Sequence, residues 1–389
     1  MRIGVDATFL RPEALHTGMG VYTRCLVSAL AAIVDEPLVL FGYGPRPVAA
    51  PRNALWSELR RLPAGRLGPW LGHQLALPEA AARQRLDVLH VPGVNLRLSQ
   101  PGVPLVAPCP LAVTVHDAIP LVYYGREGPA LPWRLRLGYR LATLAIARAD
   151  VVVTVSETSR RDIVRHLPVR AERVRVAHNG VDLPAVDDDR VGAVLAGLGV
   201  ERPYLLYAGS YEPRKNLLGA VDAYRRALAQ ADLPPMVLLV EPESGYRAAV
   251  MAEVERSGVA GRLRFVHSLS DVEVAALYRG ATLFVYPSHY EGFGFAPLQA
   301  LAAGVPVVAS SAGSLPEVLG DAALFVDPRS VDEIAGGIVR LLTDAAAAGE
   351  LAARGARQAA RYRWDAAART TLDAFRQVAG QRLQPALAL

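Results

Sequence analysis

The sequence predicts an α/β fold of two domains, each built on a mostly parallel β-sheet. Its 389 residues are more than one ordinary core holds, and 52% of them are hydrophobic, so two or three globular domains are expected. In both halves, short apolar runs alternate with stretches of helical character, which is the order of β-α-β units. No run of about 18 uncharged apolar residues occurs, so no transmembrane helix is predicted.

The first half begins with residues that predict a strand and not a signal peptide. Strands are expected at residues 2–5, 38–43, 88–90, 112–116, 151–155 and 174–177. Helices are expected at residues 21–33, 131–149 and 157–166, and proline-rich turns fill much of the rest.

The second half repeats this alternation. Strands are expected at residues 204–208, 236–240, 263–266, 283–286, 305–310 and 323–326. Helices are expected at residues 216–229, 248–257, 271–278, 297–303 and 331–343. We therefore expect an N-terminal domain at residues 1–185 and a C-terminal domain at 186–363, joined near residues 183–202. A last amphipathic helix at 364–381, within a tail of residues 364–389, packs on its own domain or crosses back to the first.

The cysteines indicate the cellular compartment, and the charge distribution indicates the kind of partner. Cys25 and Cys109 lie far apart and outside any C-x-x-C pair, which favours a reduced, cytoplasmic protein without a zinc site. Residues 1–182 carry 22 arginines against 14 acidic residues, a net charge of +8, whereas residues 183–389 carry −3. A basic half indicates an anionic partner or an arginine-rich solvated surface. No dense run of like charge occurs, and we expect no nucleic-acid partner.

Lys215 is the single lysine among 42 basic residues. It follows a buried strand and a turn, and with Arg214 it stands where a helix is expected to begin. Such a position suits an anionic group, and a compact ammonium fits beside a phosphate where a wider guanidinium does not. The alternative is that one lysine survived by chance in an arginine-rich chain.

The densest signal is YPSHYEGFGFAPLQALAAGVPVV at residues 286–308. A strand ends, a polar loop carries Glu291, and Gly292 and Gly294 allow close approach of a ligand to the backbone. Pro297 marks the first turn of a helix, whose N-terminus offers N–H groups to hydroxyl or phosphate oxygens. Gln299 lies inside that helix. The alternative is a tight strand–helix turn with a surface glutamate.

This string resembles the donor-binding segment of retaining GT-B glycosyltransferases of family 4. Further motifs match in the family's order: GMGVY at 18–22, VHDAIP at 115–120, HNGVD at 178–182, GSYEPRKN at 209–216 and SLPEV at 314–318. The resemblance implies two Rossmann-like domains whose parallel sheets face a central cleft. It also implies that the first domain binds the acceptor, through loops at about residues 44–85 and 121–135, and that the second binds the sugar nucleotide.

The resemblance also implies the site residues. As catalytic residues, Lys215 with Arg214 neutralises the diphosphate, Glu291 holds the donor sugar's hydroxyls, and His116 lies under the reacting carbon. The donor-binding set is Gly18, Gly20, Ser210, Arg214, Lys215, Asn216, Glu291, Gly292, Phe293, Gly294, Phe295 and Gln299. No metal is expected, because no D-x-D pair stands in a ligand-like context and the fold needs none.

Two residues depart from the family pattern. Gln299 replaces the second glutamate, which binds the nucleotide ribose, and an uncharged amide forms weaker bonds there than a carboxylate. Ser210 replaces an arginine that often follows the glycine of the phosphate turn, and Arg214 is expected to supply that charge.

The expected activity is retaining transfer of a hexose from an α-linked nucleoside-diphosphate sugar to a hydroxyl of a glycan or lipid-linked acceptor. The EPRKN turn is similar to that of mannosyltransferases of bacterial surface polysaccharide assembly, so GDP-mannose is the first choice of donor and a UDP-sugar the second. No cofactor is expected. A catalytically silent sugar-nucleotide-binding subunit and a GT-B epimerase remain as alternatives. A dehydrogenase is disfavoured, because no G-x-G-x-x-G follows the first strand.

Arginine beside tryptophan predicts contact with an anionic membrane at the inner face, with solvated arginines and core tryptophans as the alternative. The residues are Arg60, Arg61 and Arg66 near Trp56 and Trp70, and Arg134, Arg136 and Arg140 near Trp133 and Tyr139.

Overall fold

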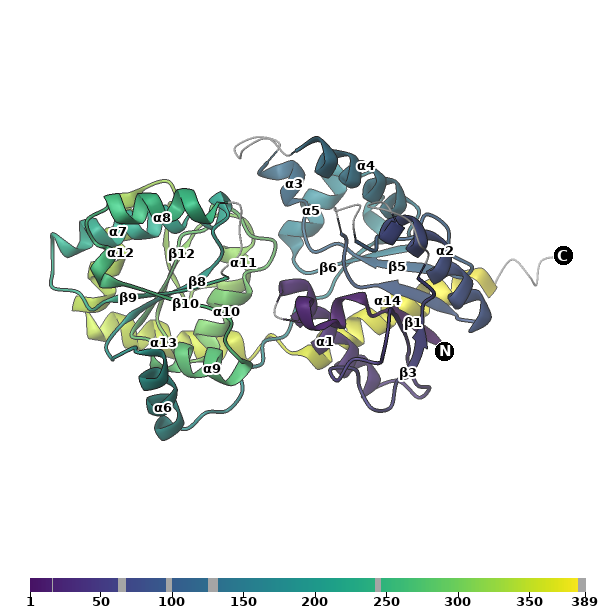
Figure 1. Ribbon diagram of the computed structural model, residues 1–389, viewed down its shortest axis with the longest axis horizontal. Helices are drawn as coiled ribbons and strands as arrows, with labels where there is room; N and C mark the ends of the chain where they lie inside the picture. The colour runs from purple at the N-terminus through teal and green to yellow at the C-terminus, as the bar shows by residue number, and fades with distance from the viewer. Residues whose placement is uncertain (16, 62–67, 96–99, 125–131, 242–245, 384–389) are drawn as a thin grey trace. The chain divides into compact units, whose positions relative to one another are not determined.

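The computed structural model describes residues 1–15, 17–61, 68–95, 100–124, 132–241 and 246–383. The chain divides into two compact units (Figure 1). The N-terminal unit comprises Met1–Gly180 together with Arg363–Leu389, and the C-terminal unit comprises Val181–Tyr362. The chain thus crosses between the units twice, after Gly180 and after Tyr362, and its last helix belongs to the N-terminal unit.

The N-terminal unit is built on a parallel sheet with the strand order β3-β2-β1-β4-β5-β6-β7 within the described residues. These strands are β1 (Ile3–Asp6), β2 (Val39–Gly42), β3 (Leu55–Glu58), β4 (Val88–Val91), β5 (Leu111–Thr114), β6 (Val151–Thr154) and β7 (Val174–Val176). The inner strands are continuous apolar runs because helices cover both faces of a parallel sheet.

The helices of the N-terminal unit connect these strands. They are η1 (Thr8–Leu10), η2 (Pro12–Ala14), α1 (Gly18–Ala31), α2 (Gly68–Arg83), α3 (Ile119–Val122), α4 (Trp133–Ala147), α5 (Glu157–His166), η3 (Ala171–Arg173) and α14 (Trp364–Leu383). Two differences from the sequence prediction stand out. The first helix begins at Gly18 instead of residue 21, because the Thr17 side chain accepts a hydrogen bond from Gly20 N and caps it.

The second difference is that β3 and α2 lie in residues 44–85, where the sequence showed no element. The strand β3 is at the edge of the sheet and is only partly buried, so it lacks the apolar run that marks an inner strand. The helix α2 carries Pro78 inside it, which interrupts the helical signal.

The C-terminal unit holds a second parallel sheet, with the order β10-β9-β8-β11-β12-β13 in the described ranges. Its strands are β8 (Leu205–Gly209), β9 (Met236–Val240), β10 (Leu263–Val266), β11 (Leu283–Tyr286), β12 (Val307–Ser310) and β13 (Leu324–Val326). The helices are α6 (Asp188–Leu198), η4 (Pro213–Lys215), α7 (Leu217–Leu228), α8 (Arg247–Arg256), η5 (Ala260–Arg262), α9 (Asp271–Gly280), α10 (Phe295–Ala302), α11 (Leu315–Leu319), α12 (Val331–Thr343) and α13 (Ala345–Ala359). The prediction of two α/β units with parallel sheets is confirmed.

The terminal helix α14 packs beside α1 within the N-terminal unit (Figure 1). Trp364, its first residue, lies 6.0 Å from the Tyr22 ring, and Phe375 lies 5.1 Å from the His90 ring. Gly180 is needed beside this start of the helix, because a Cβ there would come within 2.3 Å of Trp364 N. Among the described helices, none has both the length and the apolar character required to span a bilayer.

Candidate active site

Lys215 is placed by the turn that follows β8. The 3₁₀ helix η4 ends at Lys215, and Asn216 then takes a left-handed backbone conformation with φ +54°. The Asn216 side-chain amide donates to Pro287 O at 2.9 Å and to Pro328 O at 2.8 Å. This amide therefore ties the lysine turn to the loop that follows β11.

Glu291 is placed by the loop between β11 and α10. Its carbonyl oxygen accepts from Ser314 Oγ at 3.0 Å and from Ser314 N at 3.1 Å. Gly313 lies against the same backbone with φ +63°, and a Cβ there would come within 2.7 Å of Glu291 O. Gly294, with φ +99°, then turns the chain into α10. The loop geometry consequently requires glycine at both positions.

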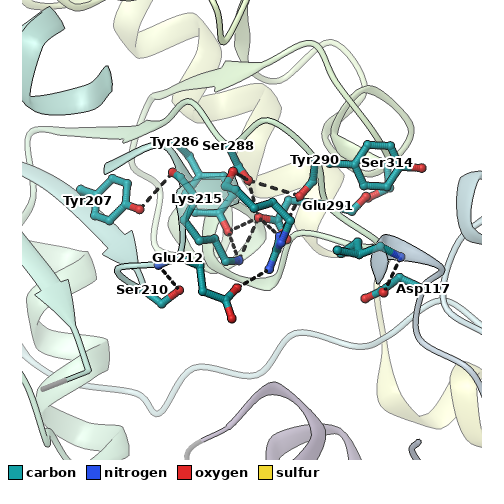
Figure 2. A network of polar contacts seen from close by, with 12 residues as sticks. Asp117, Tyr207, Ser210, Glu212, Lys215, Tyr286, Ser288, Tyr290, Glu291 and Ser314 are labelled. Carbon is teal, nitrogen blue, oxygen red and sulfur yellow. Dashed lines mark hydrogen bonds and ion pairs between the residues drawn. The ribbon is translucent and has the colours of Figure 1, made fainter. Parts of the chain in front are cut away.

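The carboxylate of Glu291 is the centre of a polar network in the C-terminal unit (Figure 2). Its Oε1 atom lies 2.8 Å from Lys215 Nζ and 3.0 Å from Arg214 Nη1. The same oxygen accepts from Tyr286 Oη at 2.9 Å and from Ser288 Oγ at 2.6 Å. Among the described residues no hydrogen bond reaches Oε2. One carboxylate oxygen is thus saturated, and the other is available to a ligand.

Charge settles the protonation of this network. Burial opposes ionisation of Glu291, but Arg214 and Lys215 outweigh it and lower the pKa of that carboxyl to about 2. Burial also raises the pKa of Tyr286 well above its usual value, and the neighbouring Glu291 adds to this shift. Glu291 is therefore an anion, and Tyr286 keeps its hydroxyl proton.

The lysine ammonium is held by two contacts. Nζ donates to Tyr286 Oη and to Glu291 Oε1, both at 2.8 Å. Burial lowers the pKa of Lys215, and the charge of Glu291 opposes that shift. An ammonium has three N–H donors, so one remains for a ligand. The side chain is mostly buried, with 18% of its surface exposed.

The other predicted residues of this unit divide by what they contact. Arg214 Nη1 also donates to Tyr290 O at 2.7 Å, so this guanidinium braces the Glu291 loop. Ser210 Oγ accepts from Glu212 N at 3.4 Å, within the turn. Asn216 uses both amide hydrogens on carbonyl groups, which makes it a residue that supports the loops.

The segment after Glu291 forms the start of α10. Gly292 is buried, and the Phe293 ring packs edge-on against Phe295 at 5.4 Å and against Tyr362 at 5.7 Å. Gln299 lies inside α10 and is partly exposed, and its amide forms no hydrogen bond with the described residues. That amide is therefore available to a ligand.

His116, Gly18 and Gly20 belong to the N-terminal unit. His116 follows β5, and its Nε2 lies 3.1 Å from Pro92 O, which can only accept, so this nitrogen carries the proton. Its ring stands perpendicular to Tyr22 with centroids 4.5 Å apart. Burial lowers the pKa of His116 to about 4, although the Pro92 carbonyl opposes the shift. His116 is thus neutral near pH 7, with Nδ1 as an acceptor.

The two glycines of the first motif differ in their surroundings. A Cβ on Gly20 would come within 1.9 Å of Ala14 O, so close packing on the preceding turn excludes a side chain there. Gly18 has open space around it.

Three residues of the network were missed from the sequence as site residues: Tyr286, Ser288 and Ser314. Tyr286 reads as the last residue of an apolar strand, and Ser288 reads as part of a turn. The polar spacing Y-P-S-x-x-E was the available signal. Among the described residues, no group of three or more His, Cys, Asp or Glu side chains is arranged to hold a metal ion.

Comparison with known proteins identifies the family. A family model described as "Glycosyltransferase Family 4" matches residues 16–184, and one described as "Glycosyl transferases group 1" matches residues 196–361. Over 385 residues the chain is 35% identical to the O-antigen chain mannosyltransferase B of Escherichia coli, covering 92% of this chain and 96% of that protein. It is 30% identical over 311 residues to the MMP alpha-(1->4)-mannosyltransferase of Mycolicibacterium hassiacum, covering 76% and 72%.

Solved structures share the fold. The sucrose-phosphate synthase of Thermosynechococcus elongatus superposes with a TM-score of 0.77 at 21% identity, covering 97% of this chain and 98% of that one. Anabaena HepE in complex with UDP-glucose superposes with a TM-score of 0.72 at 18% identity, covering 99% and 100%. The chain therefore belongs to glycosyltransferase family 4 and is a glycosyltransferase of the GT-B fold.

Proposed function

We propose that this protein is a retaining mannosyltransferase of polysaccharide assembly, with GDP-mannose as donor. The observation that carries the proposal is the Lys215–Glu291 pair, which leaves one ammonium N–H and one carboxylate oxygen without a hydrogen bond to the described residues. An anionic diphosphate and a sugar hydroxyl are the two groups that such a pair accommodates. Two relatives named as mannosyltransferases support mannose as the sugar.

Lys215 acts on the leaving group. Cleavage of the bond between the sugar and the diphosphate develops negative charge on the phosphate oxygen, and a fixed ammonium stabilises that charge. Arg214 adds positive charge at the same turn while bracing the loop. We propose that these two cations do the work without a metal ion.

Glu291 and His116 act on the sugar. Glu291 Oε2 accepts from hydroxyls of the donor sugar, because Oε1 is already occupied. His116 presents Nδ1 as an acceptor for another sugar hydroxyl, since Nε2 is bound to Pro92 O. We propose front-face displacement. The acceptor oxygen bonds to the anomeric carbon on the side that the diphosphate leaves, and the acceptor proton passes to the departing phosphate oxygen.

Gln299 and Ser210 favour a second candidate, a catalytically silent subunit that binds sugar nucleotide. Gln299 lies in α10, where the resemblance to the family implies a ribose-binding glutamate, and its amide lacks the charge of a carboxylate. Hydrolysis of the donor by the purified protein separates the two candidates, because a silent subunit releases no nucleoside diphosphate.

Thermal-shift measurements with nucleoside diphosphates test the donor. A ligand that binds only the folded state raises the unfolding temperature. We expect GDP to raise it more than UDP, and inorganic phosphate to raise it little. Absence of any shift with a nucleoside diphosphate would contradict the proposed function. A larger shift with UDP than with GDP would indicate a UDP-sugar as donor in place of GDP-mannose.

We also propose that the protein acts in the cytoplasm at the inner face of the membrane, on a lipid-linked glycan. The helix α4 exposes Trp133 at 67%, Leu137 at 40% and Leu144 at 51%. The Arg134 guanidinium lies 5.3 Å from the Trp133 ring, and Arg136 and Arg140 are also exposed. An exposed face of arginine and apolar side chains suits a boundary with anionic headgroups.

The second tryptophan group is different. Trp56 is partly buried and donates from Nε1 to Gly44 O at 3.1 Å, and Trp70 is also partly buried. Arg66 lies outside the described residues. We therefore assign the membrane contact to α4 alone.

Liposome co-sedimentation tests this contact. Binding is expected to require anionic lipid, to weaken as salt rises, and to fall when Arg136 and Arg140 are both replaced by Glu. The matched control reverses two exposed arginines of the other unit, Arg225 and Arg256. No binding to anionic liposomes at low salt would point to a soluble acceptor.

A further inference from the structure

The N-terminal unit contains a buried series of hydrogen-bonded side chains, formed by Asp6, His73 and Tyr43. These residues are separate from the site residues described above. His73 Nε2 lies 3.0 Å from Asp6 Oδ2, and His73 Nδ1 lies 3.0 Å from the Tyr43 hydroxyl. Asp6 is 2% exposed and His73 is 0% exposed, whereas Tyr43 is only partly buried. The hydrogen-bonded series thus runs from a buried carboxylate to the hydroxyl of a partly buried tyrosine.

This hydrogen-bonded series lies at the carboxyl edge of the sheet. Asp6 is the last residue of β1, and Tyr43 directly follows the last residue of β2, which pairs with β1. His73 comes from the N-terminal half of α2, the helix between β3 and β4. Open α/β sheets bind their ligands at the carboxyl ends of the strands. The position is therefore one where a ligand is expected.

The burial of the Asp6 carboxylate indicates a function other than stability. Replacing a buried charged group and its partner by well-packed apolar side chains is often neutral or stabilising, since burial removes the hydration of the charge. Both oxygens of Asp6 are occupied, because Oδ1 accepts from Thr8 N at 3.0 Å. The pKa of Asp6 is lowered from its usual value, since His73 and the Thr8 backbone N–H outweigh the burial. The carboxylate thus anchors His73 rigidly.

The Tyr43 hydroxyl, at the other end of the series from Asp6, has unused hydrogen-bonding capacity. Among the described residues the Tyr43 hydroxyl has His73 Nδ1 as its one hydrogen-bond partner. If the hydroxyl donates to Nδ1, its lone pairs stay open, and if it accepts, its own proton stays open. The exposed Arg61 guanidinium lies 5.9 Å from the Tyr43 ring centroid. The guanidinium thus lies over the ring that carries the hydroxyl.

We propose that Tyr43 and Arg61 bind hydroxyl groups of the acceptor saccharide, with His73 and Asp6 as positioning residues that hold Tyr43 in place. The inference rests on the proposed function, because it assigns the acceptor side of the same reaction. The Tyr43 oxygen exchanges a hydrogen bond with one sugar hydroxyl, and Arg61 donates to its neighbour. Vicinal hydroxyls of a neutral hexose match this donor and acceptor pair.

Tyr43→Phe is the first test, because it keeps the ring and its contact with Arg61 and removes the hydroxyl alone. With octyl α-mannoside as acceptor probe and GDP-mannose as donor, the KM for the acceptor is expected to rise about tenfold. Donor hydrolysis without acceptor, and GDP binding, should stay at the wild-type level. Arg61→Gln should raise the same KM.

Tyr224→Phe is the matched control, because it removes the hydroxyl of a buried tyrosine of the C-terminal unit that donates to Pro234 O at 2.9 Å. Its acceptor KM should not change. Asp6→Asn tests positioning, because it keeps the Tyr43 hydroxyl and changes only the carboxylate that holds His73. It should raise the acceptor KM while donor hydrolysis persists. An equal fall of donor hydrolysis would show a merely structural role.

Saturation-transfer NMR of octyl α-mannoside measures saccharide binding without any transfer. Binding to the wild type that weakens in Tyr43→Phe supports the proposal, even if no nucleoside diphosphate binds and the proposed function fails. Wild-type binding that Tyr43→Phe leaves unchanged, or no saccharide binding by the wild type, overturns it.

Discussion

Replacement of Lys215 tests the centre of the candidate site. Lys215→Ala removes an ammonium that contacts Tyr286 and Glu291 at 2.8 Å each. Glu291 keeps Arg214 at 3.0 Å, so its charge stays compensated and the fold should persist. What the variant loses is the charged donor to the leaving group.

The size of the effect follows from that loss. Removal of one preorganised donor to developing charge costs about 3 kcal/mol in the barrier, which is roughly 150-fold in kcat. Lys215→Arg should also be impaired. The Lys215 side chain is only 18% exposed and its Nζ already sits between two partners, so a planar guanidinium has little room.

The assay is kcat at saturating donor, with thermal unfolding measured beside it. Arg225→Ala is the control, because it removes the same charge from an exposed side chain, 46% accessible, on α7 of the same unit. It should leave kcat unchanged. Wild-type turnover by Lys215→Ala or Lys215→Arg would refute the reasoning and make the lone lysine an accident of composition.

Three further predictions follow from the site. Gln299→Glu should fold, remain active and bind nucleotide equally or more tightly by calorimetry, and much weaker binding would show that Gln299 does not contact the ribose. Proton NMR of the product should show the α anomeric signal, and a β product would refute retention. The pKa of His116 is about 4 in the folded chain against an ordinary 6.5, so the unfolded chain binds the proton first as pH falls. Stability should therefore drop between pH 6.5 and 4 by less in His116→Gln than in the wild type, and equal drops by thermal unfolding would contradict the buried, neutral histidine.

Local pattern predicted most of the elements, and its failures have physical causes. The inner strands of both sheets are apolar on two faces, so periodicity reveals them. The edge strand β3 and the proline-containing α2 lack that signal, and both lie in residues 44–85. The start of α1 was predicted too late in the sequence, because the cap residue Thr17 sets the first turn and the apolar stripe does not.

The sequence by itself determined the two α/β units, the lone lysine at a helix start, and the E-G-F-G loop, because each depends on neighbours along the chain. Only the tertiary structure decided which atoms meet. It assigned Oε1 of Glu291 to Lys215, which is 76 residues away, and left Oε2 available. It also joined Asp6 to His73 across 67 residues and returned α14 to the N-terminal unit. Strand order and helix packing set these contacts, and neither can be read from the local periodicity of side chains.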